Sequence, residues 1–161
     1  MSFPVYNRGL VYHKVSEKFE WGVTTTTPQQ FRTQMLELRR LGFSFSSIKN
    51  YDPTLNQIMI TFDDGYSCIN EFAAPVLDEV GGLATVFAIT DYVGKKNSWD
   101  YFPENKQVSH MNWSELRNLH EQGWEIGSHG KTHRRLIAMD HKKIQDELVS
   151  SKKHIEDQIG S

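Results

Sequence analysis

The chain has 161 residues, of which 38% are hydrophobic and 24% are charged, a composition typical of one compact soluble domain with a sizeable core. Its formal net charge of -2 gives no strongly basic surface, which argues against a protein that binds nucleic acid or acidic lipids. Its single cysteine, Cys68, excludes an intramolecular disulfide, and we interpret it as a small buried hydrophobic residue.

The sequence contains no membrane-span signal, because no stretch approaches ~18 consecutive apolar residues. Residues 1–15 also lack the apolar core of a signal peptide. The sequence as written is therefore typical of a cytoplasmic protein, although a chain with its leader removed would look the same.

The first half of the chain alternates strand and helix patterns. In chain order, these patterns predict a strand at residues 9–13, a helix at 28–41, and strands at 43–48 and 58–62. The helix has a clear start, because Thr27 can cap it, Pro28 suits its first position and Gln30 completes a capping box. Residues 58–62 are apolar on both faces, as in a buried parallel strand.

The second half continues the alternation. It predicts a helix at 69–80, a strand at 84–89, a long polar and aromatic loop at 91–110, a helix at 113–122, a short strand at 124–128 and a helix at 141–159. Asp140 caps the last helix, which is expected to bury an apolar stripe of Ile144, Leu148, Ile155 and Ile159. About five strands and four helices in this order predict an α/β fold with a parallel sheet.

Two polar motifs, TFDDGY and SHGKTH, each follow or end a predicted strand, where sites are built in α/β folds. The first contains Asp63 and Asp64, whose adjacent charges repel unless a cation lies nearby. The second contains His129 and His133. Taken alone, the Asp pair could form a turn and the His pair could be incidental. Together they predict a divalent metal site, with zinc favoured over cobalt or another ion.

Other polar and aromatic residues are candidates for contacts with a substrate. His13 ends the first strand on the same face as the motifs, and Tyr66 ends the first motif. Tyr92 and Trp99 in the long loop could stack on a sugar or serve as loop anchors. We interpret the remaining histidines as surface or loop residues: His110, His120, His141 and His154.

These motifs resemble the polysaccharide deacetylase family of carbohydrate esterases. The likeness runs from about residue 10 to residue 160, through YHKV, TFDDGY, ATVFAI with TDYVG, MNWSEL and GWEIGSHGKTH in the expected order. It implies a distorted (β/α) barrel and metal-dependent hydrolysis of an N- or O-acyl group on a sugar. It also implies that Asp63 is the general base and that Asp64, His129 and His133 are the metal ligands.

The chain departs from the family pattern at two places. Gly130 stands where a Ser or Thr usually follows the first histidine and steadies the loop by hydrogen bonding. The later family motifs, an Arg-Pro-Tyr-type stretch, an aromatic wall residue and a late histidine that acts as general acid, would lie beyond Ser161. The resemblance therefore implies one domain, residues 1–161, that is C-terminally truncated relative to the family, with an incomplete barrel.

The sequence thus predicts a metal-dependent hydrolase that removes an acyl group, expected to be N-acetyl, from a carbohydrate. One alternative is a catalytically impaired fragment that binds a carbohydrate or metal or serves in assembly; another is a deacylase of a non-sugar amide. Five strands do not close a barrel, and an open sheet edge favours association. We expect the missing strands to come from further residues, a second chain or a swapped copy.

Overall fold

The computed structural model describes residues 7–17, 24–98 and 108–160. Five strands in these ranges form one parallel sheet: β1 (Gly9–Tyr12), β4 (Ser44–Ser46), β5 (Gln57–Phe62), β6 (Thr85–Ala88) and β7 (Glu125–Ser128). The α-helices described there are α1 (Pro28–Arg40), α2 (Ala74–Glu79), α3 (Trp113–Glu121) and α4 (His141–Ile159). The predicted α/β alternation is confirmed. A pair of two-residue strands, β2 (Lys14–Val15) and β3 (Thr25–Thr26), was not predicted.

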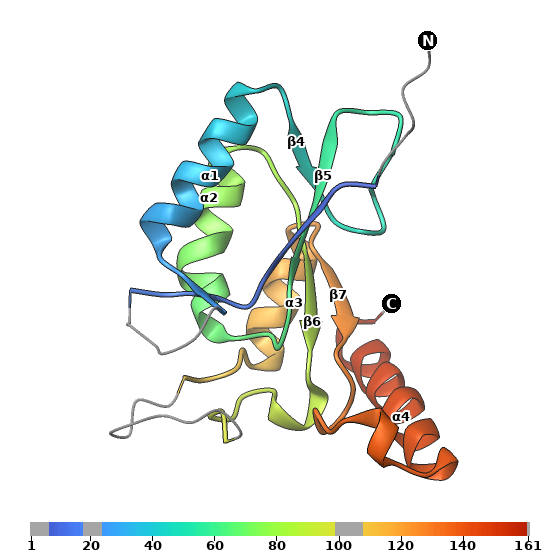
Figure 1. The fold of residues 1–161 in the computed structure, drawn as a ribbon. Helices are drawn as coiled ribbons and strands as arrows, with labels where there is room; N and C mark the ends of the chain where they lie inside the picture. Colours follow the sequence, from blue (N-terminus) through green and yellow to red (C-terminus); the bar gives the residue numbers. More distant parts are fainter. Residues whose placement is uncertain (1–6, 18–23, 99–107, 161) are drawn as a thin grey trace.

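Strand β5 lies at the centre of the sheet. Because β1 and β4 both pair with Met59, they lie on opposite edges of β5. Strand β6 pairs with the last two residues of β5, and β7 pairs with β6. All of these pairs are parallel, so the carboxyl ends of β5, β6 and β7 meet at one end of the molecule (Figure 1).

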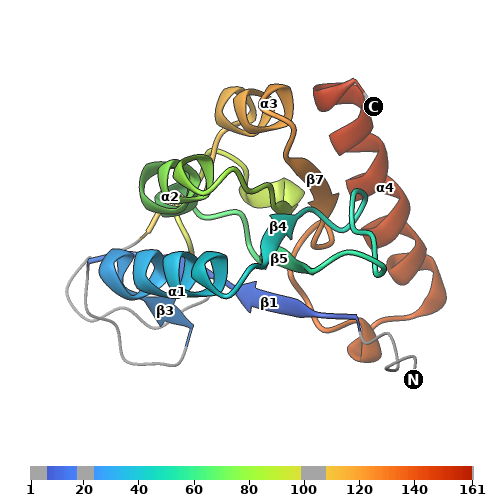
Figure 2. The ribbon, with the colours of Figure 1, turned by 90° about the horizontal axis from the view of Figure 1, so that it is seen from above.

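The helices surround the outer face of the sheet. Figure 2 shows α1, α2, α3 and α4 following one another in an arc around the strands. Within the described ranges, β1 and β7 each pair on one side only. The sheet is therefore open there, as expected from five strands, and the source of any further strands stays a prediction.

The core is centred on the end of β5. The Phe62 ring is fully buried and packs against Tyr12 of β1, Phe31 of α1 and Trp124, with ring centroids 5.7, 5.8 and 5.8 Å apart. These contacts join β1, β5 and α1 at Phe62 itself, which directly precedes Asp63. Core packing and the first polar motif are therefore adjacent along the chain.

Local signals in the sequence identify three helix starts correctly. The Thr27 and Asn112 side chains each form a capping box, with Gln30 and Glu115 respectively. The Asp140 carboxylate accepts the Lys143 amide at 2.9 Å. These bonds satisfy amides that have no partner inside a helix.

The helix predicted at 69–80 differs in its first turn. Residues Ile69–Ala73 form a π-helix, and α2 begins only at Ala74. Pro75 has no amide hydrogen and so cannot donate the α-helical bond to Glu71, which favours a locally wider turn.

The buried face of α4 also differs from the prediction. Leu148 of the predicted stripe is 50% exposed, whereas Glu147 and Ser151 are buried together with Ile155. The helix turns its polar residues inward because they bond to the segment that carries the histidine motif. None of the described helices has the length and apolar character needed to cross a bilayer.

Truncating the central ring should destabilise the fold strongly. We expect Phe62→Ala to lower the free energy of unfolding by about 3–5 kcal/mol, since the cavity removes the contacts of a fully buried ring. Urea unfolding monitored by tryptophan fluorescence measures this loss. Leu148→Ala is the control, with an expected change within about 0.5 kcal/mol because that side chain is half exposed. Equal losses in the two variants would contradict this account of the core.

Candidate functional site

Parallel strand pairing brings the two polar motifs together. Asp63 directly follows β5, and its amide donates to the Tyr12 carbonyl at 2.9 Å. His129 directly follows β7, and its amide donates to the Ala88 carbonyl at the end of β6, also at 2.9 Å. These bonds continue the sheet beyond the strands, so both motifs begin at the same edge.

Asp64, His129 and His133 form a cluster at this edge. Their ligand atoms all lie within 4.8 Å of one another. Asp64 Oδ1 lies 3.4 Å from Nε2 of His129 and 3.4 Å from Nε2 of His133. The Asp64 side chain is 7% exposed and each imidazole is 33% exposed, so solvent reaches the cluster from the histidine side.

The cluster fits a divalent cation. Asp64 Oδ1 is buried and has no hydrogen-bond partner among the described residues, which is costly for a carboxylate oxygen. Two ligands about 2.0–2.1 Å from a tetrahedral zinc ion lie about 3.3 Å apart, close to both observed distances. Two histidines and one carboxylate also leave positions open for water and substrate.

Two of the three cluster residues have a left-handed backbone. Asp64 has a φ of 69° and His133 a φ of 60°, and no other non-glycine residue in the described part of the chain has a positive φ. Such conformations are uncommon for residues other than glycine and concentrate at functional sites. Here they aim the two side chains at a common point.

Asp63 and His13 form a second pair beside the cluster. His13 Nε2 lies 4.0 Å from Asp63 Oδ2, and both side chains are partly exposed. Asp63 is not a member of the Asp64–His129–His133 cluster, although it neighbours Asp64 in sequence. The two carboxylates therefore have different surroundings: one meets the histidine pair and the other meets His13 and solvent.

The aromatic residues proposed as substrate contacts lie in different environments. The Tyr66 ring is fully buried, and its hydroxyl accepts a hydrogen bond from Asn97 at 2.9 Å. Tyr66 therefore packs inside the protein and not on an exposed sugar-binding surface. Tyr92 is partly buried, with its hydroxyl 2.9 Å from Ser98 Oγ. Trp99 lies outside the described residues.

His110, interpreted from the sequence as a surface or loop residue, is in fact buried. It is 3% exposed, and its Nδ1 lies 2.8 Å from the Asp64 carbonyl oxygen. Backbone bonds from Ser67 to Ser109 and from Met111 to Gly65 pair its segment with the end of TFDDGY. Little in the sequence indicates this contact, because it depends on pairing between segments far apart in the chain.

Two elements hold the loop that carries the histidine pair. The amides of Thr90 and Asp91, in the short 3-10 helix Thr90–Tyr92, donate to the carbonyls of Gly130 and Lys131 at 3.2 and 3.0 Å. On the other side, Glu147 of α4 accepts hydrogen bonds from the same loop. Glu147 was not recognised from the sequence, where it looks like an ordinary charged residue of a surface helix.

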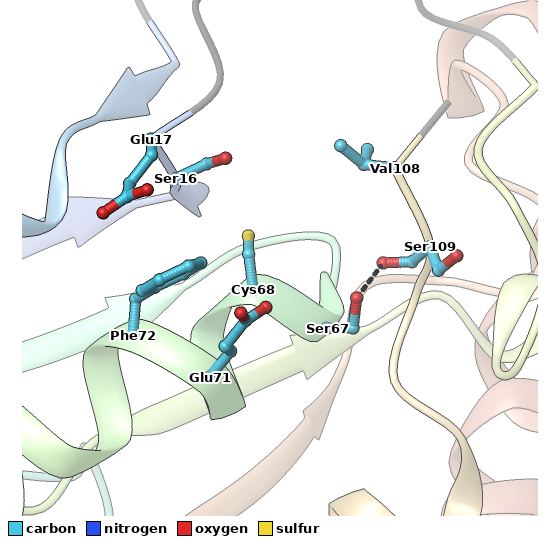
Figure 3. Close-up of a pocket in the computed structure, with 8 residues that line it drawn as sticks. All are labelled: Ser16, Glu17, Ser67, Cys68, Glu71, Phe72, Val108 and Ser109. Atoms are coloured by element: carbon cyan, nitrogen blue, oxygen red, sulfur yellow. Dashed lines mark hydrogen bonds between the residues drawn. The ribbon is translucent and has the colours of Figure 1, made fainter. Parts of the chain in front are cut away.

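A separate cavity of about 380 Å³ lies beside the π-helix (Figure 3), lined by Ser16, Glu17, Ser67, Cys68, Glu71, Phe72, Val108 and Ser109. The Cys68 sulfur points into it, and Ser67 Oγ donates to the Ser109 carbonyl at 3.0 Å. Cys68 is 8% exposed, so its prediction as a buried residue is confirmed. None of these lining residues belongs to the Asp64 cluster.

Known proteins share both the sequence pattern and the fold. The chain is 28% identical over 153 residues to YxkH of Bacillus subtilis, a polysaccharide deacetylase by name. The match covers 89% of this chain and 49% of that protein, so the chain spans about half the length of this curated relative.

Solved structures of deacetylases superimpose on nearly the whole chain. The PplD deacetylase of Streptococcus pyogenes, solved with acetate, matches with a TM-score of 0.82 and 19% identity, covering 99% of this chain and 71% of that one. The polysaccharide deacetylase BC0361 of Bacillus cereus matches with a TM-score of 0.77 and 24% identity, covering 96% and 48%. At these identities, the likeness establishes the fold.

The sequence also matches a family model. The model is that of the polysaccharide deacetylases, and it aligns with residues 50–161. This range contains Asp63, Asp64 and both histidines of the cluster. The chain therefore belongs to the polysaccharide deacetylase family.

Proposed function

We propose that this protein hydrolyses the N-acetyl group of a carbohydrate, with a divalent metal ion, preferably zinc, held by Asp64, His129 and His133. We also propose that residues 1–161 act as one deacetylase-like domain. The observation that carries the proposal is the buried Asp64 Oδ1, 3.4 Å from both imidazole nitrogens, with Asp63 beside it. Membership of the family supports the carbohydrate amide as the substrate.

Asp63 is the proposed general base. A divalent ion in the cluster would lower the pKa of a water molecule toward about 7 and polarise the acyl carbonyl. The Asp63 carboxylate takes one proton from the attacking water, and the oxygen of that water bonds to the acyl carbon. The carbon–nitrogen bond then breaks, releasing acetate and the sugar amine. Asp63 suits this role because it lies outside the ligand cluster and is reached by solvent.

His13 is the proposed proton donor to the leaving nitrogen. An amide nitrogen leaves poorly as an anion, so its departure requires a proton. His13 Nε2 lies 4.0 Å from Asp63 Oδ2 and its side chain is one-third exposed, so it borders the same reacting centre. In this arrangement Asp63, the proposed base, lies next to His13, the proposed acid, and Asp63 is followed in the chain by Asp64 of the cluster.

Removing the carboxylate ligand should abolish metal binding. We expect the purified wild-type protein to retain one zinc ion after dialysis and Asp64→Ala to retain none, since the remaining histidines provide only two ligands. Calorimetric titration and elemental analysis measure this. Asp78→Ala, a change to an exposed residue of α2, is the matched control. Equal zinc content in Asp64→Ala and wild type would rule out the proposed ligand set.

Replacing the base should separate chemistry from metal binding. Asp63→Asn keeps the side-chain shape but cannot accept the proton. We expect acetate release from N-acetylglucosamine oligomers to fall by about 10²–10⁴-fold, with zinc affinity unchanged. Activity within a few-fold of wild type would exclude Asp63 as the base. A wild-type protein that binds zinc but releases no acetate would favour the metal-binding module over the enzyme.

The proton donor can be identified by comparing how its loss affects the hydrolysis rates of two substrates with different leaving groups. We expect His13→Gln to lower acetate release from the sugar amide by about 10²–10⁴-fold. Hydrolysis of p-nitrophenyl acetate should change little, because p-nitrophenolate leaves without a proton. Rates on both substrates, measured with the same zinc-loaded protein, test this. Equal loss on the amide and the ester would show that His13 does not act as the acid.

A further inference from the structure

Glu147 on α4 is buried against the loop between the two histidines. Its side chain is 5% exposed. One carboxylate oxygen, Oε2, accepts the amides of Lys131 and Thr132, each at 2.8 Å. The other, Oε1, accepts the hydroxyl of Thr132. Three donors from two consecutive loop residues thus converge on one carboxylate.

These bonds keep the buried carboxylate ionised. Burial raises the pKa of Glu147, but the hydrogen bonds from Thr132 and Lys131 together hold it below its usual range. Hydrogen bonds to a charged acceptor are stronger than those between neutral groups. The loop is therefore tied to α4 by bonds that would be costly to leave unmade.

The loop needs an external support. Gly130 and His133 both have a left-handed backbone, with φ of 84° and 60°. Gly130 also brings no hydroxyl to the loop. Between these two residues lie Lys131 and Thr132, whose amides Glu147 holds.

A second contact links the same face of α4 to the start of the loop. Ser151, one turn after Glu147, has its hydroxyl 2.7 Å from that of Ser128, and Ser128 Oγ accepts the Gly130 amide at 3.1 Å. This side-by-side placement explains why α4 buries polar residues where an apolar stripe was expected.

We propose that Glu147 is a positioning residue, which fixes the backbone of Lys131 and Thr132 so that His129 and His133 point their Nε2 atoms at Asp64 Oδ1. The inference rests on the proposed metal site. It extends that site to a fourth residue, which touches neither the ion nor the substrate. Outer residues that orient metal ligands typically contribute about 10–100-fold to metal affinity.

Substitutions at position 147 separate positioning from general stability. Glu147→Ala removes all three acceptor bonds, and Glu147→Asp keeps the charge but withdraws it by one methylene. Glu147→Gln keeps a carbonyl for the two amides, and its NH₂ group can donate to the Thr132 hydroxyl, which is both donor and acceptor. Asp146→Ala is the control, because exposed Asp146 contacts the same loop only through Lys131 Nζ, at 2.9 Å.

The measurement is cobalt binding to the purified protein. Competition with a chromophoric chelator gives the affinity, and the visible spectrum of bound cobalt reports its ligand geometry. We expect Glu147→Ala and Glu147→Asp to lose about 10–100-fold in affinity and to change the spectrum. Glu147→Gln should stay within about three-fold of wild type, and Asp146→Ala should match wild type, since a surface ion pair contributes little.

Each outcome has one interpretation. Wild-type protein that binds no cobalt contradicts the proposed function itself. Wild-type affinity and spectrum in Glu147→Ala or Glu147→Asp, with or without a lower melting temperature, overturn the positioning role and leave the metal site intact. If Glu147→Ala does not fold, Glu147→Asp and Glu147→Gln decide the question, because equal affinity in these two variants contradicts the inference.

Discussion

The burial of one carboxylate oxygen constrains the whole sheet edge at which the two polar motifs meet. Asp64 Oδ1 is removed from water and has no hydrogen-bond partner among the described residues, a state that needs a nearby positive charge. The imidazoles of His129 and His133 reach Asp64 only if β5, β6 and β7 are parallel and in the observed register, because β6 lies between the two strands that the motifs follow. The cluster can therefore form only in a sheet with this strand order and register.

Each member of the site has a distinct support. Asp64 is fixed through its own carbonyl, which lies 2.8 Å from His110 Nδ1. The histidine loop is held by the amides of Thr90 and Asp91 on one side and by Glu147 on the other. The supports come from segments after β6, before α3 and within α4. Asp64, His129 and His133 are therefore held in place by three parts of the chain that contribute no residue to the cluster.

Local signals explain which features the sequence predicted. The capping residues Thr27, Asn112 and Asp140 act on amides within three positions, so their patterns identify helix starts directly. Both polar motifs follow predicted parallel strands, and this pattern indicated that they lie at the same edge of the sheet. His110 and Glu147 were missed because their roles depend on distant segments. A buried Glu in α4 has the same local pattern as an exposed one, and only its three loop donors distinguish it.

The nonlocal origin of the cluster also has a consequence for folding. Asp64 follows β5, whereas both histidines follow β7, with β6 and α3 between them in sequence. Contacts of such separation form late, because a long loop must close first. A chain that has formed only its first half has placed Asp64 but neither histidine, so the cluster does not yet exist in it. Metal binding at the proposed site would instead stabilise the sheet only after β7 has docked.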